Sequence, residues 1–406
     1  MKQKKSKKSI QLPNGFLYTL GCKAITPYLK IKYKFARDTG AIQGIKPPYL
    51  LLCGHTSGMD WLPTVAGMYP QKMNIVTAQH YFYNQPLKTI LPWLGAIAKQ
   101  QFQVDVSSIQ KMKKVVAMGG VINLFPEGQV SIDGKLGFVH PSLAKLVQFL
   151  GIPVVIGKLQ GAGACKPKWA KVWRKGPVKF TATPLLTAEQ VKQMPREALY
   201  HTLVEALSFD EGESIRTSGW HYKGKELAKG LENALYQCPN CGREFCTFSE
   251  EDRLICRACG NAVRIDDQLA LHPVSKKENA FPTIAEWLDW QRDQLRQKAS
   301  QPGFALVEKV VLKDPRQESS GFDRKGSGEA RFTWDGMLYQ GEIDGKSGER
   351  WFPKEHLAMI PYACGIDLEI PYGRSICVLE PENKQSVMQW ILFSELLREK
   401  EQKKKA

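Results

Sequence analysis

The chain has 406 residues, with 43% hydrophobic and 24% charged side chains, which is the composition of a globular protein of two or three domains. The formal net charge of +17 is unusual, and lysines concentrate in the first eight and the last seven residues. Nowhere do about 18 uncharged apolar residues run together, and no signal-peptide pattern follows the N-terminal lysines. We therefore expect a cytoplasmic protein that is peripheral on the inner face of the membrane and does not span it.

Charge and cysteine content indicate partners and compartment. Basic tails suit anionic lipid or nucleic acid, although a solvated arm is the plainer interpretation. Of the ten cysteines, four form a metal-binding pattern and six are scattered, so a reducing compartment is expected.

The first predicted elements lie between Asn14 and Phe35. Apolar residues from Asn14 to Tyr28 recur at near-helical spacing, and two interpretations stay open: an interfacial helix in lipid headgroups, or a helix packed on its own domain. From Leu29 to Phe35 apolar residues alternate with lysines, which predicts a strand with one buried face and one lysine face.

The segment from Pro47 to Pro63 reads as a buried strand, a tight turn and the start of a helix. His55 follows the apolar run Tyr49–Cys53, at a strand's C-terminal end, where open α/β sheets bind ligands. Asp60 comes five residues later and can return onto the imidazole, fixing its tautomer. Taken alone, the pair also fits a surface histidine and a helix-capping aspartate.

Further strands and helices alternate up to residue 207. Phe125-Pro126-Glu127-Gly128 forms a second loop at the end of an apolar strand within Gly119–Ser131. Residues Pro86–Ala98 fit either the wall of an acyl-chain groove or plain core. The remaining expected elements are strands at Asn74–Ala78, Gly151–Gly157 and Val178–Thr183, and helices at Val106–Met118, His140–Leu150 and Thr187–Leu207.

His-x4-Asp, Phe-Pro-Glu-Gly and the Pro-Val-Val strand, in this order, resemble the glycerolipid acyltransferase superfamily, which includes the 1-acylglycerol-3-phosphate acyltransferases. The resemblance covers about the first 220 residues. It implies an α/β acyltransferase domain over residues 1–225, with a mostly parallel sheet flanked by helices. His55 would be the general base and Asp60 its orienting carboxylate, while Phe125, Pro126, Glu127 and Gly128 would hold the acceptor.

The chain departs from that family at two phosphate-binding arginines. Val130 stands where one is usual, and Gly95-Ala96-Ile97-Ala98-Lys99 leads to Phe102 without the other. Lys99 and Lys135 are candidate replacements, but a lysine is a point charge and does not reproduce a bidentate guanidinium. The identity of the acceptor stays open.

A second motif lies in residues 232–275, where two Cys-x2-Cys pairs are separated by fourteen residues and each is followed by glycine. This spacing predicts a four-cysteine zinc ribbon with a closed, structural Zn²⁺ site. Cys246 lies between the pairs and is expected to be a bystander. The four predicted ligands are Cys238, Cys241, Cys256 and Cys259.

The rest of the chain predicts a linker helix over residues 280–300 and a β-rich domain over residues 301–406. Thr283 and Glu286 form the signature of a capping box. Short strand-like runs then follow one another up to Leu379, and a terminal helix spans Gln385–Glu401. Several strands closed by one helix resemble a pleckstrin-homology-like barrel.

These observations favour transfer of a fatty acyl group from acyl-CoA or acyl carrier protein to the hydroxyl of a lysophospholipid-like acceptor at an anionic membrane surface. Two alternatives are a catalytically silent lipid-binding relative and a nucleic-acid-binding zinc-ribbon protein. Nucleic acid is the less favoured partner, because acidic residues offset the arginines of the ribbon and no aromatic-basic surface accompanies them.

Overall fold

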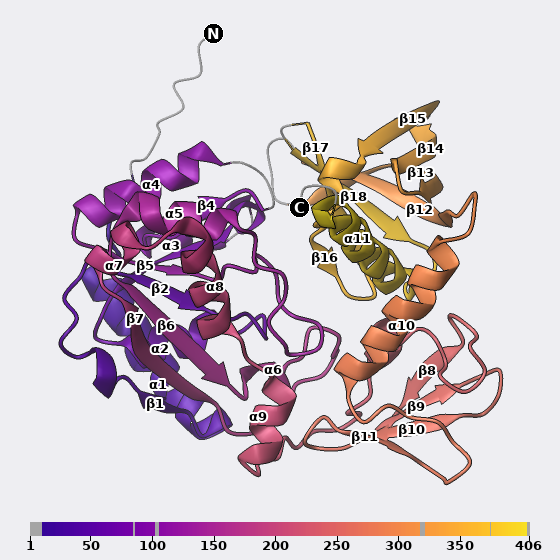
Figure 1. Cartoon of the computed structure of the whole chain (residues 1–406), viewed down its shortest axis with the longest axis horizontal. Coiled ribbons are helices and arrows are strands. Elements are labelled where there is room, and N and C mark those ends of the chain that lie inside the picture. The colour runs from indigo at the N-terminus through magenta and orange to yellow at the C-terminus, as the bar shows by residue number, and fades with distance from the viewer. Residues whose placement is uncertain (1–9, 84–85, 102–104, 317–320, 374, 404–406) are drawn as a thin grey trace. The chain divides into compact units, whose positions relative to one another are not determined.

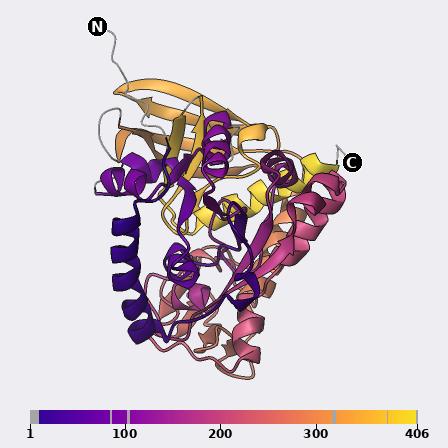
Figure 2. The ribbon, with the colours of Figure 1, turned by 90° about the vertical axis from the view of Figure 1, so that its left-hand side faces the viewer.

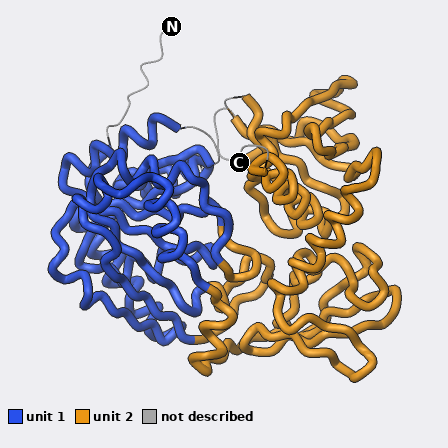
Figure 3. Tube along the Cα trace, in the orientation of Figure 1, with its two compact units in different colours: residues 1–129, 136–162, 177–209 blue, residues 130–135, 163–176, 210–406 orange. Residues whose placement is uncertain are grey.

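The computed structural model describes residues 10–83, 86–101, 105–316, 321–373 and 375–403. Two compact units divide the chain, as Figure 3 shows. Unit 1 comprises residues 1–129, 136–162 and 177–209, and unit 2 comprises residues 130–135, 163–176 and 210–406. Because the chain crosses between the units more than once, neither unit is one continuous segment of the sequence.

Unit 1 is built on a seven-stranded sheet in the order β1-β7-β6-β2-β5-β3-β4. All neighbouring strands are parallel except β6 and β7, which are antiparallel. The strands are β1 (Ala36–Asp38), β2 (Leu50–Cys53), β3 (Met73–Ala78), β4 (Ile97–Lys99), β5 (Val121–Leu124), β6 (Val154–Gln160) and β7 (Lys179–Leu186). The predicted mostly parallel α/β sheet is thus confirmed.

Helices cover both faces of this sheet (Figure 1). On one face, α4 (Val106–Ala117), α5 (Ser142–Leu150) and α8 (Arg196–Leu207) pack against alternate strand residues such as Leu50 and Leu52. On the other, α2 (Trp61–Met68) contacts β6 and β7, and α1 (Gly15–Tyr33) contacts α2. A Cβ at Gly67 of α2 would lie 2.2 Å from the Phe180 ring, so only glycine permits this approach of helix to sheet.

The strand predicted over Leu29–Phe35 is wrong, because α1 continues to Tyr33. Leu29 and Tyr33 are buried four residues apart, as one face of a helix requires, whereas Ile31 is 86% exposed. Over so few residues, alternation of apolar residues with lysines fits a strand and the border between the buried and exposed faces of a helix equally well. The helix predicted over Asn14–Tyr28 is longer than expected and includes this segment.

The helix predicted over Thr187–Leu207 is two helices. Pro195 separates α7 (Ala188–Gln193) from α8, and Thr187 caps α7 with a capping box. The segment Pro86–Ala98 forms α3 (Leu87–Trp93) and then β4. Unit 1 also contains the 3₁₀ turns η1 (Gly40–Ile42) and η2 (Gln79–Tyr83).

Unit 2 contains two antiparallel sheets. A four-stranded sheet, ordered β11-β10-β9-β8, consists of β8 (Thr247–Glu250), β9 (Arg253–Cys256), β10 (Ala262–Ile265) and β11 (Leu271–Pro273). A seven-stranded sheet is ordered β15-β14-β13-β12-β18-β17-β16. Its strands are β12 (Leu306–Pro315), β13 (Phe322–Phe332), β14 (Gly336–Ile343), β15 (Lys346–Pro353), β16 (Tyr362–Ala363), β17 (Asp367–Tyr372) and β18 (Ser375–Pro381).

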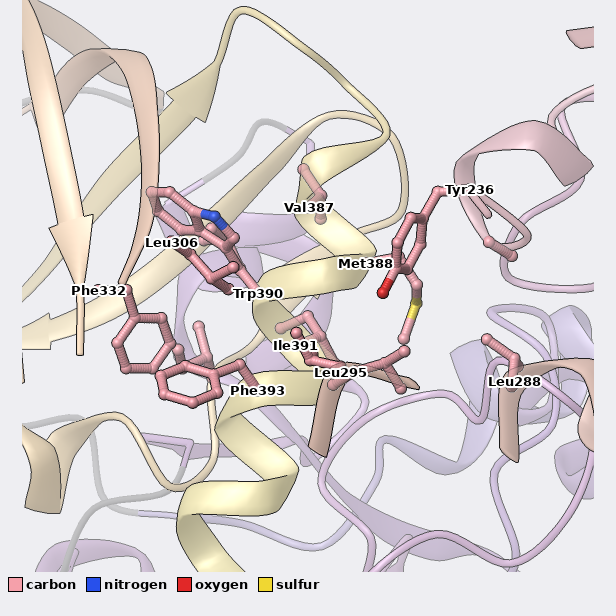
Figure 4. Packing of buried hydrophobic residues seen from close by; sticks show 14 of the residues in the cluster. Tyr236, Leu288, Leu295, Leu306, Phe332, Val387, Met388, Trp390, Ile391 and Phe393 are labelled. Carbon is pink, nitrogen blue, oxygen red and sulfur yellow. The ribbon is translucent and has the colours of Figure 1, made fainter. Parts of the chain in front are cut away.

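The helices α10 (Ile284–Ala299) and α11 (Ser386–Lys403) supply much of the core of unit 2. Figure 4 shows Trp390 and Phe393 of α11 beside Phe332 of β13, and the Phe332 and Phe393 ring centroids are 4.7 Å apart. The C-terminal region is therefore β-rich and ends in a helix, as predicted. Unit 2 also contains α9 (Glu211–Thr217), η3 (Leu231–Asn233) and η4 (Lys354–His356), and α6 (Ala162–Cys165) begins at the last residue of a unit 1 segment.

Candidate active site

His55 and Asp60 meet at the carboxyl end of β2. His55 Nδ1 lies 2.9 Å from Asp60 Oδ2, and the Ser57 backbone N–H donates to the same oxygen, also at 2.9 Å. Asp60 is fully buried just before α2, while 21% of the His55 side chain is exposed. A buried carboxylate at Nδ1 favours the tautomer that carries its proton there, which leaves Nε2 as the basic nitrogen.

The Phe125-Pro126-Glu127-Gly128 loop follows β5, the strand next to β2, and lies against His55. The Phe125 ring stacks on the imidazole, with centroids 4.6 Å apart and planes inclined by 30°. Glu127 Oε1 accepts the His55 backbone N–H at 2.7 Å. The structure thus brings together the residues of the two motifs that are far apart in sequence.

Both carboxylate oxygens of Glu127 are engaged by backbone amides. Oε2 accepts the Gly137 N–H at 2.7 Å, while Oε1 holds His55. Burial raises the pKa of the Glu127 carboxyl to about 7, against the opposing effect of these two hydrogen bonds. Through these contacts Glu127 links the backbone of His55 to that of Gly137, while its role in acceptor binding stays a prediction.

Gly128 and Lys99 both belong to unit 1, and the loop after Lys99 contacts Gly128 through Gln101. Gly128 has φ +71°, and the Gln101 side-chain amide donates to its carbonyl oxygen at 2.5 Å. Lys99 ends β4, two residues before Gln101, and burial lowers its pKa. Lys135 belongs to unit 2, where its Nζ lies 3.6 Å from Asp210.

Sequence reasoning missed Gln101, Gly137 and the amide of Ser57. Backbone donors carry no side-chain signal, and Gln101 lies in no recognised motif. Ser57, the hydroxyl residue two positions after His55, is fully buried and has no exposed hydroxyl to offer a substrate. Of the two side chains, only that of His55 is partly exposed.

The four predicted cysteine ligands converge in unit 2. Their sulfur atoms all lie within 4.8 Å of one another, with Sγ–Sγ distances of 3.7 Å for Cys238–Cys259 and 3.8 Å for Cys241–Cys256. A tetrahedral Zn²⁺ with Zn–S bonds of about 2.3 Å needs edges close to these values. Gly242 and Gly260 have φ +71° and +77°, which lets each pair turn tightly. The donor set and its spacing fit a metal ion.

Three asparagines join the two cysteine pairs to the segment before α10. Asn240 Nδ2 lies 3.6 Å from Cys259 Sγ, and Asn279 donates to Asn240 Oδ1 at 2.9 Å. Asn261 accepts the Asn279 N–H at 2.8 Å and donates to its carbonyl oxygen at 3.0 Å. Cys246 bonds to the Glu244 carbonyl instead and stands outside the cluster.

Comparison with known protein families finds a match for the part of unit 1 that contains His55 and the Phe125–Gly128 loop. Residues 31–156 match the family described as Acyltransferase. The matched residues contain both the His55 and the Phe125–Gly128 motifs, so the match supports the predicted resemblance for this part of the chain. No curated protein matches the chain significantly.

Two solved structures show partial likeness. The 1-acyl-sn-glycerophosphate (LPA) acyltransferase PlsC from Thermotoga maritima is 15% identical, with coverage of 50% of this chain and 78% of PlsC and a TM-score of 0.41. The Ran-binding domain of the nuclear complex component Nup2 from Ashbya gossypii is 14% identical, with coverage of 23% and 94% and a TM-score of 0.19. Both scores are low, and neither likeness is evidence of function.

Proposed function

We propose that this acyltransferase moves a fatty acyl group from acyl-CoA or acyl carrier protein to the hydroxyl of a lysophospholipid-like acceptor. The observation that carries the proposal is the His55–Asp60 pair, at 2.9 Å, with a buried carboxylate and a partly exposed imidazole. Phe125 stacks on one face of that imidazole and fixes its plane. This geometry suits a general base that works on a bound hydroxyl.

The transfer needs one base and no covalent enzyme intermediate. His55 Nε2 takes the proton of the acceptor hydroxyl as its oxygen attacks the thioester carbonyl carbon. The tetrahedral intermediate then breaks its C–S bond, and the imidazolium returns the proton to the leaving thiolate. The products are an ester and a free thiol. Asp60 keeps the ring oriented and stabilises the imidazolium electrostatically.

The acceptor would lie against the loop Phe125–Gly128, with Lys99 as the nearby candidate for an anionic head group. Gly128 exposes backbone without a side chain, and Lys99 lies two residues from Gln101, which binds the Gly128 carbonyl. An anionic group would favour the ammonium form that burial disfavours. Lys135, the other lysine predicted from the sequence, belongs to unit 2 beside Asp210 and is not part of this proposed site in unit 1.

The remaining parts of the chain would support this enzyme at a membrane. Among the described residues, no helix combines the length and apolar character needed to cross a bilayer. We infer a peripheral enzyme on the cytoplasmic face, drawn to anionic lipid by its net charge of +17. The same charge suits an acidic carrier protein as donor. The four cysteines would hold a structural Zn²⁺ in a ribbon. The C-terminal domain, which we propose to be pleckstrin-homology-like, would dock lipid or protein.

The experiment that tests the proposal is thiol release from long-chain acyl-CoA and, separately, from acylated carrier protein. The acceptor panel includes lysophosphatidate, other lysophospholipids and neutral monoacylglycerols. His55→Ala should lower acceptor-dependent release by about 10²–10⁴-fold, the usual contribution of a general base. His201→Ala, an exposed histidine of α8, is the matched control.

Each result of this assay has a definite meaning. Release that depends on an acceptor and is lost only in His55→Ala supports the enzyme and identifies its acceptor class. Equal release by His55→Ala and wild type would remove His55 from the mechanism. No release from either donor with any acceptor would contradict the proposal and favour a silent lipid-binding relative.

A further inference from the structure

Two short basic segments of unit 2 are joined by backbone hydrogen bonds. Residues 163–176, which connect β6 to β7, contain four lysines and one arginine but no Asp or Glu, and residues 221–229 add three more lysines. Lys175 and Lys223 exchange both backbone hydrogen bonds, at 2.8 and 2.9 Å. The colour bar locates both segments in Figure 2. The pairing brings two runs of lysines onto one surface.

Lys175 and Lys223 are directly opposite each other in this antiparallel pair. Residues that exchange both hydrogen bonds send their side chains to the same face, and like charges in such positions repel. Among the residues that the structure describes, neither ammonium has a carboxylate in ion-pair contact. Glu226, the acidic residue of the second segment, pairs instead with Lys229 at 2.8 Å. The fold therefore keeps a repulsion that an acidic partner would relieve.

The exposed lysines surround one tryptophan. Exposure alternates over residues 173–175, where Trp173 and Lys175 are exposed and Arg174 is buried. Half of the Trp173 side chain is exposed, and a Cβ at Gly224 would lie 3.4 Å from the Trp173 carbonyl oxygen, which places the tryptophan beside the second segment. We define the cationic patch as the exposed residues Lys171, Trp173, Lys175, Lys223 and Lys225.

A buried arginine lies beneath the cationic patch. Arg174 Nη2 donates to the Leu227 carbonyl oxygen at 2.6 Å, and its Cζ lies 5.0 Å from the Trp169 ring. Its Nε and Nη1 have no hydrogen-bond partner among the described residues. Burial lowers the pKa of the guanidinium to about 10, so it stays charged at neutral pH. Because solvent screens a buried charge weakly, Arg174 adds to the positive potential of the patch while it fixes the first segment to the second.

We propose that the cationic patch docks the acidic surface of the acyl carrier protein that delivers the donor acyl group. The identity of this partner rests on the function proposed above. Lysines act as point charges, which suits carboxylates spread over a protein surface, and tryptophan is a frequent anchor of protein interfaces. Single-stranded nucleic acid fits less well, because successive bases stack on several rings, whereas Trp173 is the one aromatic member of the patch.

A binding measurement tests this surface without catalysis. The probe is fluorescently labelled holo acyl carrier protein, titrated with the full chain and followed by anisotropy. Lys175→Glu/Lys223→Glu should raise Kd by about tenfold or more, because it turns attraction for an acidic surface into repulsion. Both opposed charges reverse together, so the repulsion between them is unchanged and the fold should be kept. Far-UV circular dichroism verifies this.

The matched control is Lys276→Glu/Lys277→Glu. These two lysines of unit 2 are exposed outside the patch, and their reversal changes the net charge by the same amount. This control should keep the wild-type Kd. Equal loss in the two double variants, or an unchanged Kd in Lys175→Glu/Lys223→Glu, would overturn the proposal. Patch-dependent binding of a single-stranded oligonucleotide or of anionic vesicles, without binding of the carrier protein, would also overturn it and assign the patch to another polyanion.

Turnover separates this proposal from the proposed function. With palmitoyl carrier protein as donor, KM should rise about tenfold in Lys175→Glu/Lys223→Glu, while the kinetics with palmitoyl-CoA stay at wild-type values. An equal rise in KM for both donors would overturn the assignment to a protein surface. Patch-dependent binding of the carrier without thiol release from either donor would count against acyl transfer and still support the docking surface. Turnover of palmitoyl-CoA by a wild type that does not bind the carrier would support the enzyme and overturn the docking surface.

Discussion

Two short polar motifs organise the two units of this chain, and they are supported in different ways. The His55 loop of unit 1 lies at the carboxyl end of the central strand of a seven-stranded sheet that helices cover. The buried carboxylates of Asp60 and Glu127 accept hydrogen bonds from its backbone. The cysteine pairs of unit 2 lie at the end of a four-stranded sheet, where Cys241 and Cys259 are exposed. Residues 257–260 are exposed throughout.

The difference shows that the surroundings of a motif decide whether its residues contribute to activity or to stability. A loop carried on a large core keeps its position when one side chain changes, so its residues are available for chemistry. The tips of the cysteine pairs bury no apolar side chain of their own, so a metal ion bound by the four thiolates would supply the energy that holds them. Substitutions in the first motif should therefore reduce activity, and substitutions in the second should reduce stability.

Loss of the metal should give the largest effect. Cys256→Ser removes one of four thiolate ligands, and metal binding in such small modules is worth on the order of 10 kcal/mol. We expect the variant to lose its bound zinc, measured by elemental analysis, and to show an early thermal transition and new proteolytic cleavage near the cysteine pairs. Cys246→Ser, whose thiol bonds to the Glu244 carbonyl, should keep both metal and stability. A full complement of zinc in Cys256→Ser would contradict the four-thiolate site.

Asp60→Asn should have the next largest effect, and on activity. The amide keeps the shape of the carboxylate but removes the charge that fixes the His55 tautomer and stabilises the imidazolium, so turnover should fall by about 10²–10⁴-fold. The measurement is kcat with the acceptor that the thiol-release panel identifies, beside a thermal melt. A lower melting temperature with an unchanged kcat would mean that the His55–Asp60 pair contributes to stability and not to activity.

Local signals explain most of what the sequence predicted correctly. The apolar run Tyr49–Cys53 becomes β2, and His55 and Asp60 meet because only one tight turn separates them. The spacing within each Cys-x2-Cys pair is likewise a local signal for two neighbouring metal ligands. Thr283 caps α10, as its three-residue distance from Glu286 predicted. The alternation from Leu29 to Phe35 failed because Leu29 and Tyr33 satisfy a four-residue period as well as a two-residue one.

Long-range partners explain what the sequence did not reveal. Glu127 accepts amides that are 72 and 10 residues away, from His55 and Gly137. Any residue except proline offers such a donor, so only the fold selects these two. The sequence also gives no sign that residues 130–135 and 163–176 belong to unit 2. No change in composition marks either crossing of the chain between the units.

Glu127→Gln separates positioning from acceptor binding. The amide leaves one of two backbone donors without its acceptor, which costs about 1–3 kcal/mol in a buried site. If Glu127 positions His55, kcat should fall by about tenfold to a hundredfold with little change in KM, whereas an acceptor contact would raise KM. Glu197→Gln, on exposed α8 surface, is the control. A rise in KM alone would assign Glu127 to the acceptor.

The same variant should alter the pH dependence of stability. Because the folded pKa of about 7 lies above the ordinary value of 4.5, the folded state binds the proton more tightly. The contribution of Glu127 to folding is therefore fully present below pH 4.5 and is lost as pH rises through 7. Glu127→Gln should remove that decline from denaturant titrations between these values, while Glu197→Gln retains it. An unchanged slope would mean that Glu127 titrates normally in the folded state.

The smallest effects come from one helix cap in each unit, and they test whether the units differ in stability. Thr187 caps α7 in unit 1 and Thr283 caps α10 in unit 2, each accepting the N–H of the residue three positions on. Replacement of either by alanine should cost about 1 kcal/mol, and serine should restore most of it. If the two units unfold in separate transitions, Thr187→Ala lowers only one midpoint and Thr283→Ala only the other. Chelation of the metal should then move the Thr283 transition alone, because only unit 2 contains the cysteine cluster. A single transition that both variants shift equally would show that the chain unfolds as one cooperative body.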